Sequence, residues 1–171
     1  MEIQFAQGQD LEGILEIYNH AILNTTAVYN YQAHSLEMRR QWWEEKCRLG
    51  HPVLVALEQG RVVGFASYGP FRAWAAYQYT MESSVYVHPL HQGKGIGIEL
   101  YSKLIQEAQK NEVHTLVAGI DAENLVSIAL HRKFGFEPVA HFKQVGYKFG
   151  KWLDLVFYQL LLDGPANPKE G

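Results

Sequence analysis

Three glycines lie within five positions of the stretch HPLHQGKGIG, residues 88–97. The β-rich run VYV precedes this stretch, and the amphipathic run IELYSKLIQEAQ follows its last glycine. Glycine has no Cβ, and the first N–H groups of a helix have no partner inside the helix. A loop of this kind can therefore bring a phosphate close to the backbone. The alternative is a glycine-rich turn that only caps the helix.

The loop does not match the common nucleotide-binding motifs. A Walker loop requires Ser or Thr after its lysine, whereas Gly95 follows Lys94. A dinucleotide loop that started at Gly93 would need a third glycine where Ile98 stands. Lys94 supplies a positive charge, and Gln92 can orient the loop or donate a hydrogen bond. The identity of the phosphate has to come from other parts of the chain.

Hydrophobic periodicity predicts the elements that position this loop. Asp10 is expected to cap a first helix, and Ser35 is expected to begin a second one that ends before Gly50. The first helix has the apolar stripe Leu11, Ile14, Leu15, Tyr18 and Ile22. Further helices are predicted after the glycine loop, beginning around residues 95–97, and in NLVSIALHRKF.

The predicted strands determine the fold class. Strands are predicted at residues 3–5 and in PVLVALE, VVGFASYG, TMESSVYVH, HTLVAGI, FEPVAHF and WLDLVFYQLLL, with KQVGYKFGK joining the last two. Hairpins in the middle of the chain exclude a strict alternation of strand and helix. We therefore predict an α/β (α+β) fold with a mixed, mostly antiparallel central sheet flanked by helices on both faces.

Length, charge and cysteine content limit the class of protein. The chain has 171 residues, of which 47% are hydrophobic and 19% charged, enough for one domain with its own core. We expect a single domain over residues 1–163 and a loose polar tail over 164–171. The formal charge of −3 and the lack of a Lys/Arg run argue against a nucleic-acid partner. Cys47 is the only cysteine, which excludes a disulfide scaffold.

The first residues and the apolar runs bear on localisation. The start of the chain, MEIQFAQGQD, lacks the basic and apolar regions of a signal peptide. No run of 18 apolar residues is present, so a membrane-spanning helix is not expected. The predicted localisation is cytoplasmic, without a membrane partner.

Two motifs, in this order and at this spacing, are typical of one superfamily. The pattern Q-x-x-G-x-G is formed by Gln92, Gly95 and Gly97. About 30 residues later the pattern N-x-x-[AS]-x-x-x-[YH]-x-x-x-G-F is formed by Asn124, Ser127, His131, Gly135 and Phe136. Together they resemble the GNAT acetyltransferase superfamily, in which the first motif holds the pyrophosphate of acetyl-CoA. The resemblance covers nearly the whole chain.

Four stretches resemble one branch of that superfamily, the phosphinothricin and methionine sulfoximine N-acetyltransferases. They are IYNHAILNTTAVYN, MESSVYVHPLHQGKGIG, IALHRKFGF and QVGYKFGKWLDLVFYQ. The resemblance implies that acetyl-CoA is the co-substrate and that a free amino acid attacks its thioester directly through the α-amino group. Methionine sulfoximine, methionine sulfone and phosphinothricin are the implied substrates, whose acetylated products no longer inhibit glutamine synthetase. A detoxifying homodimer is also implied.

The resemblance assigns the cofactor contacts and one anion-stabilising group. The implied contacts are Val85, Tyr86, Val87, Gln92, Gly93, Lys94, Gly95, Ile96, Gly97, Ile98, Asn124 and Ser127. A backbone N–H of residues 85–87 would stabilise the oxyanion. No metal is expected, since His88 and His91 are spaced like a metal pair but have no evident third ligand.

Glu82 and His131 are the implied catalytic residues. Glu82 would take a proton from the ammonium of the amino acid, and burial among aromatic residues could raise its pKa. His131 stands where many relatives have a tyrosine facing the sulfur, and it could protonate the departing thiolate. The alternatives are a strand-end carboxylate exposed to water or one that only holds the ammonium, and an ordinary surface or core histidine.

The acceptor site is predicted to contain one arginine and several aromatic residues. Arg72 can grip carboxylate or sulfoximine oxygens with two parallel hydrogen bonds. Trp74, Tyr29 and Tyr31 could form the walls, and Lys148 could be a second anion contact, from this chain or from a partner subunit. Each of these could instead be an ordinary surface or core residue.

Two other functions stay open. A GNAT enzyme could act on another small amine or on a protein N-terminus, although a cationic substrate would favour an acidic site and Arg72 and Lys148 argue mildly against one. A non-catalytic acetyl-CoA-binding module would keep the loop but lose the acid and base, whereas Glu82 and His131 are both present.

Overall fold

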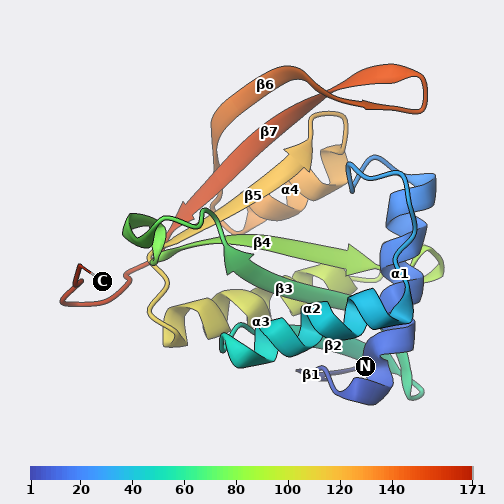
Figure 1. The fold of residues 1–171 in the computed structure, drawn as a ribbon, viewed down its shortest axis with the longest axis horizontal. Coiled ribbons are helices and arrows are strands. Elements are labelled where there is room, and N and C mark those ends of the chain that lie inside the picture. The colour runs from blue at the N-terminus through green and yellow to red at the C-terminus, as the bar shows by residue number, and fades with distance from the viewer. Residues whose placement is uncertain (171) are drawn as a thin grey trace. The chain divides into compact units, whose positions relative to one another are not determined.

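The computed structural model describes residues 1–170 (Figure 1). Within these residues it has four α-helices and seven strands, in the sheet order β1-β2-β3-β4-β5-β7-β6. The pairs β1–β2, β2–β3, β5–β7 and β6–β7 are antiparallel, whereas β4 and β5 are parallel. The predicted mixed, mostly antiparallel sheet is confirmed.

The chain divides into two compact units. The first unit contains residues 1–25, 30–68 and 84–105, and the second contains residues 26–29, 69–83 and the chain from Gln106 on. Strand β4 (Thr80–Val87) is divided between the units: residues 80–83 belong to the second unit and residues 84–87 to the first. The prediction of a single domain over residues 1–163 stays a prediction.

The first unit contains the glycine loop and the helices that precede it in the chain. Its elements are β1 (Glu2–Phe5), α1 (Leu11–Asn24), α2 (Leu36–Arg48), β2 (Val53–Glu58) and most of β3 (Arg61–Pro70) and α3 (Ile96–Lys110). Strand β3 belongs to this unit as far as Tyr68. The Ser35 hydroxyl accepts a hydrogen bond from the Met38 N–H, which confirms Ser35 as the cap of α2. Asp10 stands at the predicted N-cap position of α1, but its carboxylate accepts the Gln7 N–H instead of an N–H of α1.

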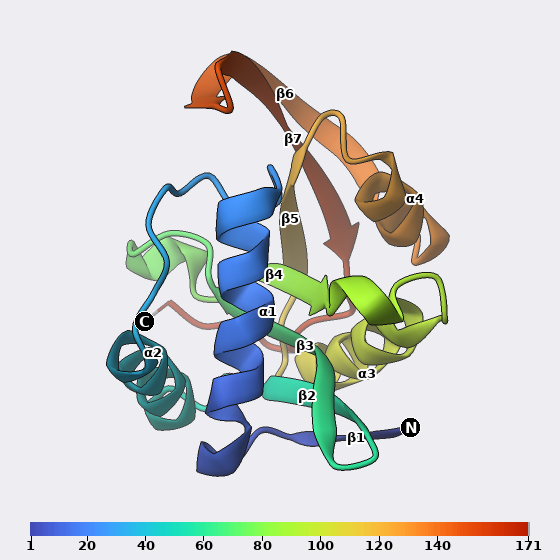
Figure 2. The same cartoon turned by 90° about the vertical axis from the view of Figure 1, so that its right-hand side faces the viewer.

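Helices cover both faces of the first unit's strands, as predicted. Phe65 of β3 belongs to a core cluster with Ile14 and Ile17 of α1. The neighbouring Gly64 faces the other way, where a Cβ would lie 2.9 Å from Leu100 Cδ1 of α3. Figure 2 shows α1 and α3 on opposite sides of β3. The buried stripe of α1 includes Ile17 in place of the expected Leu15.

The second unit contains β5 (Thr115–Asp121), α4 (Leu125–Lys133), β6 (Glu137–Lys148) and β7 (Lys151–Leu161). The stretch KQVGYKFGK was expected to join two strands, but β6 continues through most of it. Only Phe149 and Gly150 form the turn, with φ angles of 51° and 74°. Positive φ at both residues is typical of a type I′ hairpin turn, which usually contains Asn-Gly or Asp-Gly. Phe149 stands where Asn or Asp is usual, so the sequence did not indicate a hairpin turn at this position.

Lys169, near the end of the chain, has hydrogen bonds to the segment before β4, and the loose polar tail over 164–171 stays a prediction. The Lys169 carbonyl accepts a hydrogen bond from the Gln78 side chain at 2.8 Å, and the Lys169 N–H donates to the Tyr79 hydroxyl at 3.0 Å. Gly171 lies outside the described residues. Among the described residues, no helix is long and apolar enough to cross a membrane.

Candidate active site

The glycine loop has a backbone that only glycine adopts easily. Gly93 and Gly95 have φ angles of 76° and 84°, in the left-handed region. The loop is tied to the end of β4, because the Gln92 side chain lies within hydrogen-bond distance of the Val87 carbonyl, at 3.4 Å. Lys94 is exposed to solvent. The loop is therefore shaped by its glycines, and its one cation is available to a ligand.

Helix α3 begins directly after the loop, at Ile96. The Ile98 and Glu99 N–H groups both donate to the Gly95 carbonyl, at 3.0 and 3.1 Å. The N–H groups that come before them have no carbonyl partner within the helix, and the helix dipole gives this end a partial positive charge. The arrangement can bind a phosphate group through the backbone.

His88 and His91, at the entrance to the loop, both lie close to carboxylates. His91 Nδ1 is 3.0 Å from Glu58 Oε2, and His88 Nε2 is 3.6 Å from Glu16 Oε1. Among residues 1–170, no group of three or more His, Cys, Asp or Glu side chains is placed to hold a metal ion.

Glu82 lies in the half of β4 that belongs to the second unit, paired with Val117 of β5. The side chain is exposed at the strand surface, not buried as the sequence suggested. Surrounding protein nevertheless removes enough water to raise its pKa, and the positive charge of Arg72 opposes this rise. An exposed carboxylate with a raised pKa can be reached by an amine and can accept its proton.

Gly119 of β5 provides the surface on which the Glu82 carboxylate lies. A Cβ on Gly119 would be 3.2 Å from Glu82 Oε1 and 3.3 Å from Phe157 Cε1. The missing side chain therefore lets the carboxylate and the aromatic ring approach the same point of the strand. Sequence reasoning missed this glycine, because it lies inside a strand pattern and belongs to no motif.

Arg72 follows β3 and lies among aromatic side chains of the second unit. Its guanidinium carbon is 5.0 Å from the centre of the Phe71 ring, which contacts Tyr77 and Phe157 edge-on. Arg72 is exposed, and Trp74 is 77% exposed. Both side chains are thus available to a ligand, as the predicted acceptor site requires.

Helix α4 holds the second sequence motif. The Asn124 side chain caps the helix by accepting the Ser127 N–H at 3.1 Å. His131 is buried, and its Nδ1 lies 2.7 Å from the Ser127 carbonyl. Because a carbonyl can only accept, Nδ1 carries the proton of the neutral ring. Burial lowers the pKa of His131, although the bond to Ser127 opposes this, so the neutral form dominates at neutral pH.

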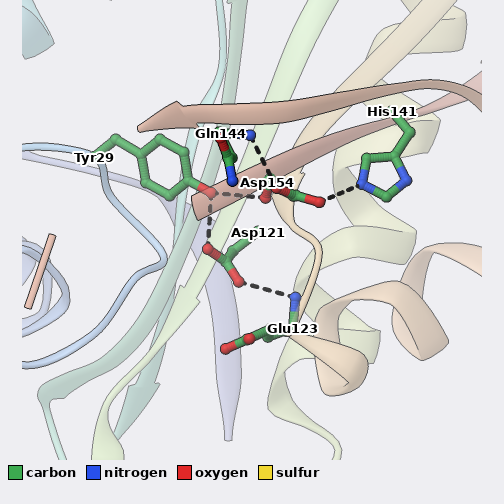
Figure 3. Close-up of polar contacts among 6 residues, drawn as sticks. All are labelled: Tyr29, Asp121, Glu123, His141, Gln144 and Asp154. Atoms are coloured by element: carbon green, nitrogen blue, oxygen red, sulfur yellow. Dashed lines mark hydrogen bonds and ion pairs between the residues drawn. The ribbon is translucent and has the colours of Figure 1, made fainter. Parts of the chain in front are cut away.

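Tyr29 belongs to a polar network in the second unit (Figure 3). Its hydroxyl lies 2.7 Å from Asp121 Oδ2 and 3.0 Å from the Asp154 carbonyl. Its ring lies against Gly146, where a Cβ would be 2.8 Å from Tyr29 Cδ2. Burial and the hydrogen bond to Asp121 raise the pKa of the phenol. Asp121 and Asp154 could not be recognised from the sequence, because isolated carboxylates resemble surface residues.

The network continues on both sides of Tyr29. Asp121 Oδ1 accepts the Glu123 N–H at 2.9 Å, just before the cap of α4. Asp154 accepts the Gln144 N–H at 2.9 Å and lies 2.8 Å from His141 Nε2. These contacts lower the pKa of Asp154, mainly through the bond from Gln144. The network thus holds the end of β5 and the β6–β7 hairpin around Tyr29.

Lys148 and Tyr31 complete the set of predicted acceptor-site residues. Lys148 is 5% exposed, and its ammonium donates to the Val28 carbonyl of the same chain at 2.7 Å. Burial lowers its pKa. Tyr31 belongs to the first unit and is 68% exposed. Lys148 therefore has a structural contact of its own, which the sequence did not indicate.

Comparison with known proteins identifies the family. A family model described as "Acetyltransferase (GNAT) domain" matches residues 3–157. An L-methionine sulfoximine/L-methionine sulfone acetyltransferase from Salmonella typhimurium is 50% identical over 168 residues, which are 98% of each chain.

Two solved structures agree with this match in fold. A GNAT superfamily phosphinothricin acetyltransferase from Sinorhizobium meliloti, in complex with acetyl-CoA, is 36% identical with a TM-score of 0.94, covering 99% of this chain and 94% of that one. A ribosomal-protein-alanine N-acetyltransferase from Brucella melitensis is 51% identical with a TM-score of 0.93, and the match covers 95% of this chain and 100% of that one. With its glycine loop, its capped α4 and these relatives, the chain belongs to the GNAT acetyltransferases and is an N-acetyltransferase.

Proposed function

We propose that this enzyme acetylates the α-amino group of a free amino acid, with methionine sulfoximine, methionine sulfone and phosphinothricin as candidate substrates. The Salmonella relative named for the first two of these compounds supports the proposal, because the two chains match over 98% of their lengths. The structural observation that carries it is Glu82, an exposed carboxylate whose pKa is raised. Detoxification in the cytoplasm is the corresponding biological role.

Acetyl-CoA is proposed to bind through the loop and the two elements that flank it. The backbone N–H groups of residues 93–98 and the Lys94 ammonium would hold the pyrophosphate. Asn124 and Ser127 are proposed to contact the pantetheine arm or the phosphates. A backbone N–H of residues 85–87 would stabilise the oxyanion that develops on the thioester carbonyl.

The reaction removes two protons from the ammonium nitrogen and supplies one to the sulfur. Glu82 takes a proton from the ammonium, and the neutral nitrogen then attacks the thioester carbon. The new N–C bond forms as the C–S bond breaks, and the electron pair leaves on the sulfur. The attacking nitrogen then carries a positive charge and loses its second proton to solvent to give the neutral amide. The thiolate recovers a proton to give free coenzyme A. Removal of the proton from the ammonium by Glu82 matters more for the rate than protonation of the sulfur, because a thiolate is a tolerable leaving group.

His131 is proposed to supply the proton to the sulfur. Only the imidazolium can do so, and burial lowers the pKa of this ring, so little imidazolium is present at neutral pH. We therefore expect His131 to contribute less to the rate enhancement than Glu82 does.

The acceptor is proposed to be held by Arg72 and by the aromatic side chains Trp74, Tyr29 and Tyr31. Arg72 and Trp74 are exposed, as a binding role requires. Lys148 is proposed to act only indirectly, by fixing the segment at Val28 through its hydrogen bond. This differs from the anion contact that the sequence suggested.

A protein N-terminus is the second candidate acceptor. The Brucella structure named as a ribosomal-protein-alanine N-acetyltransferase favours it, at 51% identity. The two candidates differ in whether the acceptor carries a free carboxylate next to its amine.

The enzyme is proposed to be a homodimer that associates through the β6–β7 hairpin. Its exposed apolar side chains include Val139, Phe142, Val145, Tyr147, Phe149, Trp152 and Leu161. The Tyr147 and Trp152 rings contact each other at 5.1 Å, which extends the apolar surface across both strands. Exposed patches of this kind often mark protein interfaces.

Sedimentation velocity at micromolar concentration tests the homodimer. The wild type should sediment as a dimer, and Trp152→Lys should sediment as a monomer because it places a charge in the apolar patch. A wild type that remains a stable monomer would contradict the proposed association.

Thiol release from acetyl-CoA tests the choice of acceptor. Methionine sulfone, methionine sulfoximine and phosphinothricin should give far higher kcat/KM values than spermidine or a peptide with N-terminal alanine. Mass spectrometry of the product should place one acetyl group on the α-nitrogen. Turnover of the peptide in preference to every free amino acid would overturn the proposal and favour the second candidate.

Gly95→Asp tests the coenzyme A loop. The substitution adds a side chain at a residue with φ of 84° and a negative charge where the pyrophosphate is proposed to lie. Acetyl-CoA affinity measured by calorimetry should fall more than tenfold, or by about 1.4 kcal/mol or more. Gly50→Asp is a matched control, because Gly50 also has a positive φ, 70°, with open space for a side chain, and it follows α2 instead of belonging to the loop. A folded Gly95→Asp variant with unchanged affinity would refute this binding site.

A further inference from the structure

The glycine part of the loop after β4 has little support of its own. Residues 92–94 are exposed, and a Cβ on Gly93 or Gly95 would meet no atom within 4 Å. Glycine also permits more backbone conformations than any other residue. The conformation of this segment therefore depends on how its two ends are held, and both ends belong to the first unit.

The end that leads into α3 is held by apolar packing. Ile96, the first residue of the helix, is 2% exposed. Its Cγ2 lies 3.2 Å from the point where Gly64 of β3 would carry a Cβ, so the start of the helix packs directly on the strand. The other end is a short 3₁₀ turn, Pro89–His91, in which no residue is buried. Polar contacts must hold this turn.

The turn is attached to the β2–β3 hairpin at two points. The His88 N–H donates to the Val63 carbonyl of β3 at 2.9 Å. His91 Nδ1 lies 3.0 Å from Oε2 of Glu58, the last residue of β2. The hairpin has a tight turn at residues 59–60, with φ angles of 50° and 74°. Glu58 is therefore a fixed point, and His91 is the side chain that binds the loop entrance to it.

The contact between His91 and Glu58 is a hydrogen bond in either charge state of the histidine. An ionised carboxylate can only accept, so Nδ1 carries a proton. The two side chains are 28% and 32% exposed, so water screens their contact less than it screens a surface pair. Arg61 is the other charged residue nearby, since it pairs with Glu58 across the hairpin and lines the same cavity as both side chains.

His88 and its carboxylate are arranged differently. His88 Nδ1 accepts the Leu90 N–H at 3.2 Å and so caps the turn. Its Nε2 is 3.6 Å from Glu16 Oε1, which is too long for a hydrogen bond, and the Glu16 side chain is 73% exposed. Glu16 therefore places a negative charge near the turn without holding it.

We propose that the hydrogen bond between His91 and Glu58 positions the coenzyme A loop, which makes both side chains positioning residues for the cofactor. The inference rests on the proposed function, because it takes this loop as the coenzyme A site. A loop held at both ends presents its N–H groups in one arrangement, so less conformational freedom is lost when the pyrophosphate binds. Without the bond, the glycine segment is held only at α3.

The effect of Glu58→Ala on coenzyme A affinity separates positioning from electrostatics by its sign. The substitution removes a negative charge near a site for a polyanion, so charge alone predicts tighter binding. Loss of the attachment predicts weaker binding, and calorimetry with coenzyme A should show a loss of about three- to tenfold. His91→Ala should give a loss of similar size, and the double variant should lose no more than either single variant.

Glu16→Ala is the matched control, because it removes the same charge beside the same turn and breaks no hydrogen bond. Its affinity for coenzyme A should equal or slightly exceed that of the wild type. A loss in Glu16→Ala as large as that in Glu58→Ala would overturn the inference, and so would a Glu58→Ala variant that binds coenzyme A as tightly as the wild type or more tightly.

A second pair of variants covers the case in which an alanine variant does not fold. His91→Asn and His91→Leu have side chains of nearly the same shape, but only asparagine can place an N–H donor where Nδ1 stands. His91→Asn should stay within about twofold of the wild-type affinity, whereas His91→Leu should lose about three- to tenfold. Equal affinities of the two variants would leave His91 as a residue that only fills space beside the hairpin.

Failure of this inference is distinguishable from failure of the proposed coenzyme A site. If Gly95→Asp folds and binds coenzyme A with unchanged affinity, the loop is not the site, and this inference fails with it. If Gly95→Asp weakens binding while Glu58→Ala and His91→Leu do not, only the role of the hydrogen bond is refuted.

Discussion

The Glu82 carboxylate loses part of its hydration and yet remains exposed to solvent. The surrounding residues of the second unit maintain both properties. Loss of water raises the pKa and makes the group a stronger base, whereas exposure lets an amine reach it. Gly119 allows the carboxylate to lie against β5, next to Phe157. The positive charge of Arg72 opposes this rise in the pKa of Glu82.

The Tyr29 network fixes elements that carry other proposed site residues. Asp121 is 4% exposed and has hydrogen bonds to the Tyr29 hydroxyl and to the Glu123 N–H. The second of these bonds holds the turn at Glu123 (Figure 3). This turn leads to Asn124, whose side chain caps α4, the helix that carries His131. A buried carboxylate with two donors is stable where it is, so this turn has one defined conformation.

Sequence patterns predicted the features that depend on local backbone chemistry. The glycine loop, the cap Ser35 and the strands of the mixed sheet all have short-range signals, and the structure contains each of them. Gly119 and Asp121 could not be predicted, because their roles come from residues distant in the chain. The burial of Arg39 could not be predicted for the same reason, since a helical arginine in a polar stretch resembles a surface residue.

The pH dependence of kcat/KM tests the central role of Glu82 most directly. It should be measured with L-methionine sulfone for the wild type, Glu82→Gln and His131→Ala. Wild-type activity should fall as the pH drops through the raised pKa of Glu82, because the protonated carboxyl group cannot accept a proton. Glu82→Gln should lose about 10²–10⁴-fold at neutral pH and recover part of this at high pH, where free amine is abundant. His131→Ala should lose less and should not recover. Near-normal activity of Glu82→Gln at pH 7 would contradict the account.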